Sequence, residues 1–296
     1  MVKKYFKPWY FILPGLFLGL VTLGIPIFEA IRNSFYDIKL YRMGTELFVG
    51  LSNYFRLWND RIFLISVRVT LIFAIGCTLL SLFFGLSIAS VLSSEKIRGS
   101  LTARIFMAFF IIPFVTTQVV TGVMGRLFIW DAEFGLINYL LGLLGVDGLE
   151  WLTTAGLALP AAIITNAWRL TPLALLILYA ALATIPETLI ESAKMDGASE
   201  WKILTRIKLP MIKFHIIFVS LIILTSAFRE FDVIFSLSGR GPARTTNVLS
   251  LMVYEQGVNV GNMGYANAVA FTMFLIIAAI TIIYMTVFNI GEVGGS

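Results

Sequence analysis

The sequence has few of the residues that form disulfides, metal sites and charged surfaces. It contains one cysteine, Cys77, and one histidine, His215, which excludes an intrachain disulfide and any metal site built from several histidines. Only 13% of its 296 residues are charged, whereas an average soluble domain has about 25%. This deficit is too large for a chain whose whole surface faces water, so we expect an integral membrane protein.

Motifs of ATP hydrolysis and of hydrolytic catalysis are also missing. The sequence has no G-x-x-x-x-G-K-[ST] phosphate loop. Its glycine-containing segment Gly239–Pro242 lacks the lysine of that motif. It has no H-E-x-x-H motif and no evident pairing of a nucleophile with a histidine. We therefore expect no enzymatic activity in this chain. Its formal net charge of +5 is modest and argues against a nucleic-acid partner.

Long apolar segments are abundant. The chain is 58% hydrophobic, with a mean hydropathy of +0.90, and a membrane-spanning helix needs roughly 20 mostly apolar residues. The segments that meet this requirement are Trp9–Ile31, Phe63–Leu92, Ala103–Trp130, Ala155–Leu182, Phe214–Leu237 and Tyr265–Ile290. The sequence therefore predicts an all-α membrane protein with six transmembrane helices.

The placement of lysine and arginine predicts the orientation, because cytoplasmic loops are enriched in both residues. More of them lie on the inner side when the N-terminus is cytoplasmic, and the acidic loop Asp131–Thr154 has none. We therefore expect both termini in the cytoplasm. Lys3, Lys4 and Lys7 precede the first apolar run as in a signal peptide. That run is longer than a signal-peptide core, so we favour a retained helix.

A polar stretch between the fourth and fifth spans, residues 184–212, predicts two short helices. Thr184 and Glu187 have the spacing of a capping box, with Thr184 as the N-cap residue of a helix that runs to Asp196. Gly197 can end that helix in a left-handed conformation. Ser199 can cap the second helix, which we expect Pro210 to close. On helix physics alone, this stretch could be an amphipathic connection at the membrane surface.

The residues of this stretch resemble the EAA loop of ABC-importer permeases. The family pattern is E-A-A, three residues, G, nine residues and I-x-L-P. It matches Glu191-Ser192-Ala193, Gly197 and Ile207-Lys208-Leu209-Pro210, with Ser192 in place of an alanine. Other segments resemble sugar-type permeases: Ile129–Leu141, Phe231-Asp232, Gly239–Pro242, in which Arg240 is a departure, and Gly264–Ala268.

The resemblance implies one permease subunit of a type I ABC importer that translocates a sugar, of the di- or oligosaccharide class. It implies three parts: residues 1–65 with the first helix and an extracytoplasmic loop, residues 66–290 as the transmembrane domain with coupling loop 184–212, and a cytoplasmic tail, residues 291–296. The location it implies is the cytoplasmic (inner) membrane of a prokaryote, with several passes.

The partners that the resemblance implies are a second, different permease subunit, two copies of a cytoplasmic ABC ATPase and an extracytoplasmic solute-binding protein. A homodimer of permeases stays open as an alternative. No cofactor is expected in this chain, because the partner ATPase would bind ATP and Mg.

In this family the EAA loop docks in a groove on the ATPase and passes ATP-driven closure to the membrane gate. The resemblance assigns ATPase contact to Glu191 and the sharp turn to Gly197. We expect Trp201 to be an apolar anchor, although a lipid-facing Trp201 is an open alternative. The expected coupling residues are Glu191, Ser192, Ala193, Asp196, Gly197, Trp201, Ile207, Leu209 and Pro210.

Polar side chains inside predicted spans indicate a candidate solute pathway, because they are costly in lipid. Sugar hydroxyls donate and accept hydrogen bonds and therefore suit amide, guanidinium and carboxylate groups. Asn166 matches a sugar-contacting position of maltose-type permeases. The candidate pathway residues are Asn166, Trp168, Arg169, Arg229, Glu230 and Phe231. An internal ion pair between Arg169 and Glu230 is the alternative to solute contact.

An ion-coupled secondary transporter of a small polar solute is the alternative function. It would use intramembrane acids for coupling, and Glu29, Glu230 and Asp232 are candidates. Inverted repeats would favour it, and the sequence shows none. Only the importer requires an ATPase subunit that co-purifies with the chain.

Overall fold

The computed structural model describes residues 9–42, 44, 46–94 and 97–288. Lys3, Lys4, Lys7 and Lys96, the expected tail 291–296 and the end of the last predicted span lie outside these residues. The chain divides into two compact units. The first comprises Met1–Leu64 and Met252–Leu275, and the second comprises Ile65–Leu251 and Ile276–Ser296.

The first unit begins with a long apolar helical stretch, formed by α1 (Trp9–Gly19), a π-helical turn (Leu20–Gly24) and α2 (Ile25–Asn33). A short antiparallel hairpin follows, in which β1 (Tyr36–Asp37) pairs with β2 (Leu47–Phe48). Helix α3 (Ser52–Asn59) is tied to this hairpin because Asn53 donates to the carbonyls of Ser34 and Tyr36 at 2.9 and 3.1 Å. The hydroxyl of Tyr265 donates to Asp60 at 2.6 Å and joins the two parts of the unit.

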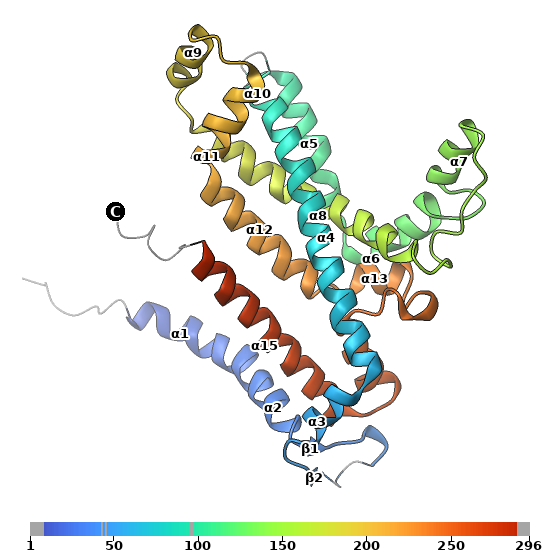
Figure 1. Ribbon diagram of the computed structural model, residues 1–296. Helices are drawn as coiled ribbons and strands as arrows, with labels where there is room; N and C mark the ends of the chain where they lie inside the picture. The colour runs from blue at the N-terminus through green and yellow to red at the C-terminus, as the bar shows by residue number, and fades with distance from the viewer. Residues whose placement is uncertain (1–8, 43, 45, 95–96, 289–296) are drawn as a thin grey trace, which may run out of the picture. The chain divides into compact units, whose positions relative to one another are not determined.

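Figure 1 shows the remaining helices. They are α4 (Arg61–Leu92), α5 (Leu101–Val115), α6 (Gln118–Met124), α7 (Leu136–Leu143), α8 (Ala158–Ala183), α9 (Glu187–Met195), α10 (Glu200–Ile203), α11 (Leu209–Met211), α12 (Lys213–Phe228), α13 (Asp232–Leu237), α14 (Leu249–Tyr254) and α15 (Met263–Val287). Shorter helical turns are Leu40–Arg42, Gly125–Ile129, Leu204–Lys208, Pro242–Arg244 and Glu255–Asn259.

Four helical stretches are long and apolar enough to cross a membrane: Ile12–Asn33, Arg61–Leu92, Ala158–Ala183 and Met263–Val287. Two bent pairs raise the number to six if each is one span: Leu101–Val115 with Gln118–Ile129, and Glu200–Met211 with Lys213–Phe228. The predicted span over residues 103–130 is not one continuous helix, because the chain bends by 98° there. Thr116 and Thr117 are extended, and the Thr117 hydroxyl caps α6.

Helix α8 is the centre of the second unit, because 72% of its most apolar 18-residue stretch is buried. It packs closely on α4 because small residues face each other, a common arrangement between membrane helices. A Cβ on Gly85 would lie only 2.5 Å from the Cβ of Ala174, so α4 needs glycine at this point. The hydroxyl of Ser81 adds a hydrogen bond to the carbonyl of Ala167 at 3.2 Å.

The predicted fifth span, residues 214–237, is also interrupted. Helix α12 ends at Phe228, and the short helix α13 begins at Asp232. Helix α13 packs on α6, where a Cβ on Gly122 would lie 2.6 Å from the carbonyl oxygen of Val233. The break between α12 and α13 contains Arg229, Glu230 and Phe231, three of the candidate pathway residues.

Candidate functional site

The polar stretch after α8 forms two short helical segments, as the sequence predicts. Helix α9 ends at Met195, and Gly197 follows with φ of 77°, the left-handed conformation that favours glycine. The amide of Ala198 donates to the carbonyl of Ala193 at 2.9 Å and closes the end of the helix. Ser199 caps the second segment through the amide of Lys202 at 3.4 Å. The predictions for Gly197 and Ser199 are confirmed.

The predicted capping box is wrong. Thr184 is the C-cap residue of α8, and its hydroxyl donates to the carbonyl of Ala181 at 2.8 Å. The N-cap of α9 is Pro186, which makes no side-chain cap. Glu187 bonds instead to Arg98, a residue 89 positions away in sequence. A distant cation has replaced the local donor that the capping box needs.

The expectation that Pro210 closes the second segment is also wrong. The helical path continues from α10 through the π-helical turn Leu204–Lys208 and α11, and it ends at Met211. Pro210 lies in the first turn of α11, where its missing amide hydrogen is harmless. The bend to α12, 72°, therefore lies at Ile212.

Most of the expected coupling residues lie on the surface of this loop. Glu191, Ser192, Asp196, Gly197 and Pro210 are exposed, and Ala193, Ile207 and Leu209 are half-buried. Trp201 is 71% exposed. Met195 is 88% exposed. It was not among the predicted coupling residues, although a large apolar residue in a polar loop could have indicated it. Ile203, which is fully buried, holds the second segment against the rest of the unit.

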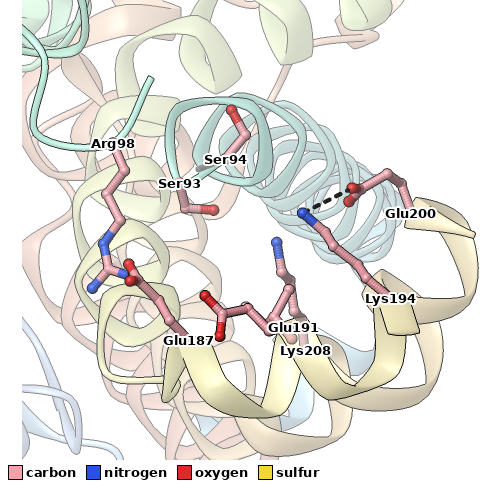
Figure 2. Close-up of a pocket in the computed structure, with 9 residues that line it drawn as sticks. Ser93, Ser94, Arg98, Glu187, Glu191, Lys194, Glu200 and Lys208 are labelled. Atoms are coloured by element: carbon pink, nitrogen blue, oxygen red, sulfur yellow. Dashed lines mark hydrogen bonds and ion pairs between the residues drawn. The ribbon is translucent and has the colours of Figure 1, made fainter. Parts of the chain in front are cut away.

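A cavity of about 160 Å³ lies between the coupling loop and the turn that follows α4. Figure 2 shows the labelled side chains around it. Arg98 pairs with Glu187 at 2.7 Å, and Lys194 pairs with Glu200 at 3.6 Å. The side chains of Glu191 and Lys208 lie between these two pairs (Figure 2). The cavity is lined by Ser93, Ser94, Arg98, Glu187, Ile190, Glu191, Lys194, Glu200 and Lys208.

Three of the candidate pathway residues form one buried cluster. The Nη2 of Arg169 donates to Glu230 Oε2 at 2.7 Å and to Asn166 Oδ1 at 3.0 Å. The side chains of Arg169 and Glu230 are only 9% and 1% exposed. The other oxygen of Glu230 accepts the amide of Val233 at 3.2 Å. This ion pair joins α8 to the break before α13.

The other three pathway candidates make different contacts, although each is next in sequence to a member of this cluster. Trp168 is 43% exposed and lines an apolar groove of about 450 Å³ with Phe84, Phe110 and other residues of α4, α5 and α8. Arg229 is exposed and donates to the carbonyl of Thr225 in its own helix at 3.2 Å. Phe231 stacks on Phe235, with ring centroids 5.2 Å apart.

Comparisons with known proteins connect these features to a transport family. Residues 81–291 match the family described as "Binding-protein-dependent transport system inner membrane component". The chain is 34% identical to the trehalose/maltose transport system permease protein MalF of Thermococcus litoralis, over 93% of this chain and 91% of that protein.

Solved structures show the same fold. One is a bacterial ABC transporter involved in import of the acidic polysaccharide alginate. Its matching chain has a TM-score of 0.80 at 20% identity, with 94% of this chain and 93% of that chain covered. A second structure of an alginate transporter, in complex with a periplasmic protein that carries an alginate pentasaccharide, has a TM-score of 0.79 at 21% identity. It covers 93% and 91% of the two chains.

Proposed function

Because this chain belongs to the family of inner membrane components of binding-protein-dependent transport systems, we propose that it is the permease subunit of an importer for a di- or oligosaccharide. A multi-pass location in the inner membrane follows from the family and from the apolar helices. The sugar class is supported by the relatives, since the permease of Thermococcus litoralis serves trehalose and maltose. We place both termini and loop 184–212 on the cytoplasmic side.

Partner subunits complete the proposed importer. A solute-binding protein delivers the sugar from outside, two copies of an ABC ATPase bind ATP and Mg in the cytoplasm, and a second, different permease chain lies beside this one. Residues 66–290 are then the transmembrane domain, residues 1–65 supply the first helix and an extracytoplasmic loop, and residues 291–296 are a cytoplasmic tail. A homodimer of this chain is the alternative that subunit analysis would detect.

The observation that carries the proposal is the coupling loop. Its two helical segments meet at Gly197, and they present Trp201 and Met195 to the surface although both are large and apolar. Exposed apolar side chains in a charged loop fit a protein partner, because buried aromatic residues are frequent anchors of interfaces. We propose that Glu191, Ser192, Ala193, Asp196, Gly197, Trp201, Ile207, Leu209 and Pro210 form the ATPase-facing part of the loop.

The solute pathway is proposed along α8 and the break between α12 and α13. The polar atoms of Asn166, Arg169 and Glu230 bond to one another in this conformation. We propose that these residues meet the sugar when helix motion separates the pair, with Trp168, Arg229 and Phe231 along the same route. Separation of the pair exposes groups that both donate and accept hydrogen bonds, as sugar hydroxyls require.

Substrate-stimulated ATP hydrolysis by the reconstituted complex tests the function. The wild-type complex with its binding protein and trehalose or maltose is compared with a complex that carries Glu191→Ala and Gly197→Pro. We expect the double variant to retain its subunits and to lose both stimulated hydrolysis and import. Import that follows an ion gradient and needs no ATPase would instead establish the secondary-transporter alternative.

A further inference from the structure

One guanidinium group bonds to both sides of the joint between α8 and the coupling loop. Nη1 of Arg98 donates to Oε1 of Glu187 at 2.7 Å, and Nη2 donates to the carbonyl oxygen of Ala183 at 2.7 Å. Ala183 is the last residue of α8, and Glu187 is the first residue of α9. Figure 2 shows Arg98 above Glu187 at the edge of the cavity.

The side chains of the joint itself add no hydrogen-bonded cap to α9. Helix α9 has no side-chain N-cap, and its N-cap residue, Pro186, carries no amide hydrogen. The hydroxyl of Thr184 donates back to α8 and not forward to α9. In the described part of the chain, the Arg98 side chain links the two helices by bonding to the end of α8 and to the start of α9.

Hydrogen bonds hold Arg98 and the described residues on either side of it. The amide of Arg98 donates to the carbonyl of Ser94 at 2.8 Å, at the end of α4. Gly99 has φ of 72°, and Ser100 caps α5 through the amide of Ala103 at 3.1 Å. The position of the Arg98 backbone therefore follows the positions of α4 and α5.

Helices α4 and α8 also contact each other at mid-length, where Gly85 meets Ala174 and Ser81 bonds to Ala167. Arg98 adds a second point of attachment at the end of α8. We propose that Arg98 is a positioning residue that makes α4, α8 and the coupling loop move together. When the ATPase displaces the loop, the movement is then transmitted to the membrane helices and is not absorbed by bending at the joint between α8 and α9. This inference rests on the proposed function.

The shape of the guanidinium matters more here than its charge. The Arg98 and Glu187 side chains are 30% and 63% exposed, and exposed ion pairs contribute little to stability. A guanidinium has a fixed fork of donors that can serve a carboxylate and a carbonyl together, whereas an ammonium is a single point charge. Arg98→Lys keeps the charge and loses the fork, so we expect it to fold and to couple poorly.

The test measures ATP hydrolysed per sugar imported by reconstituted complexes that carry Arg98→Lys, Glu187→Gln or Glu46→Gln. Glu46 pairs with Arg32 at 3.7 Å on the first unit and is a matched control, because that pair is also exposed. We expect the ratio to rise about five-fold in Arg98→Lys, because one lost hydrogen bond lowers by about that factor the population in which the loop and the helices move together. We expect a smaller rise in Glu187→Gln and no change in the control.

The amount of ATPase that co-purifies with each variant separates positioning from folding. A purely structural loss would lower the amount of complex without changing the ratio in the complex that remains. A ratio in Arg98→Lys equal to that of Glu46→Gln overturns the inference and leaves the proposed function intact. A wild-type complex without sugar-stimulated hydrolysis overturns the proposed function and this inference with it. If the Arg98→Lys complex does not assemble, Glu187→Gln is compared with the control instead. A ratio above that of Glu46→Gln supports the inference, and an equal ratio overturns it.

Discussion

Arg169 and Glu230 form a salt bridge of 2.7 Å between residues that are 61 positions apart in sequence. Both side chains are almost fully buried; Asn166 Oδ1 also accepts from Nε of Arg169, and the amide of Val233 donates to the other oxygen of Glu230. A buried pair of this kind is costly to break from one side, because the remaining charge has no compensation. It fixes the interrupted segment before α13 against the central helix α8.

Removing one partner of this pair should therefore destabilise the protein strongly. We expect Arg169→Met or Glu230→Gln alone to lower the free energy of unfolding by about 3–5 kcal/mol. The double variant Arg169→Met with Glu230→Leu should recover most of that loss, since apolar replacement of a whole buried pair is often nearly neutral. Chemical unfolding in detergent measures all three variants.

The same double variant tests the proposed pathway. A folded double variant that has lost sugar import while the ATPase still co-purifies supports contact between the cluster and the sugar. Import at the wild-type rate by the double variant would remove Arg169 and Glu230 from the pathway and leave them a structural role. Single variants as stable as wild type would contradict the buried pair itself.

The turn at Gly197 should not tolerate a side chain well. Nothing lies within 4 Å of a Cβ built on Gly197, so its φ of 77° is the whole constraint. We expect Gly197→Ala to cost about 1–2 kcal/mol at this turn and to reduce sugar-stimulated ATP hydrolysis, with Gly197→Asn milder. Gly142→Ala is the matched control, because Gly142 also has open space around it and lies in α7. Equal hydrolysis by Gly197→Ala and the control would refute this explanation.

The two exposed apolar residues of the coupling loop should contribute to ATPase binding. We expect Trp201→Ala to weaken the affinity for the ATPase by about 2 kcal/mol or more, as for an interface anchor, and Met195→Ala to have a smaller effect. Titration of the ATPase onto the permease in nanodiscs measures this affinity. Phe134→Ala is the control, because Phe134 is 83% exposed but lies on a different loop.

The lipid-facing alternative for Trp201 gives a distinct result. Brominated lipids would then quench Trp201 fluorescence in the absence of the ATPase, and Trp201→Ala would bind the ATPase normally. Spectra are compared with those of a Trp201→Phe variant, because the chain has other tryptophans.

The turn before α7 should respond to pH through Asp131. The Asp131 carboxylate accepts the backbone amides of Phe134 and Glu133, each at 2.9 Å, and these bonds hold its pKa below the usual range. Because the bonds to the ionised carboxylate lower its pKa, they stabilise the turn fully at pH values above the normal aspartate pKa of about 3.9. This stabilisation is lost as the pH falls through the lowered pKa.

Hydrogen exchange at the amides of residues 133 and 134 measures this effect. We expect protection at neutral pH in the wild type and little protection in Asp131→Ala at the same pH. In acid, the wild type should approach the variant. Identical exchange in the two proteins at neutral pH would show that the carboxylate does not stabilise the turn.

The sequence predicted features that depend on local chemistry. The apolar segments became helices, Gly197 took the left-handed conformation and Ser199 capped the following segment. Each of these outcomes depends on a few neighbouring residues, so a short stretch of sequence contains the needed information. Membership of the permease family was likewise visible in the spacing of a short motif and is confirmed by the family match.

Features that depend on distant residues were not predictable. Hydropathy does not reveal the bend at Thr116 and Thr117, because both flanking segments are apolar. The failed capping box has a similar cause, since Glu187 is held by Arg98 from another helix connection. The ion pair between Arg169 and Glu230 was expected only as the alternative to solute contact, because its formation depends on how α8 packs against the break before α13.

The 98° bend between α5 and α6 has a consequence for membrane insertion during synthesis. Helix α5 has 15 residues and α6 has seven, so neither reaches the roughly 20 residues that a stable span needs. Backbone polar groups at a break within the membrane also need protein or water around them. In the folded chain α8 packs on α5, and α13 packs on α6. The ribosome synthesises α5 and α6 before α8 and α13, which pack on them. The bent pair can therefore reach its packed conformation only after the chain has been synthesised as far as residue 237, the end of α13.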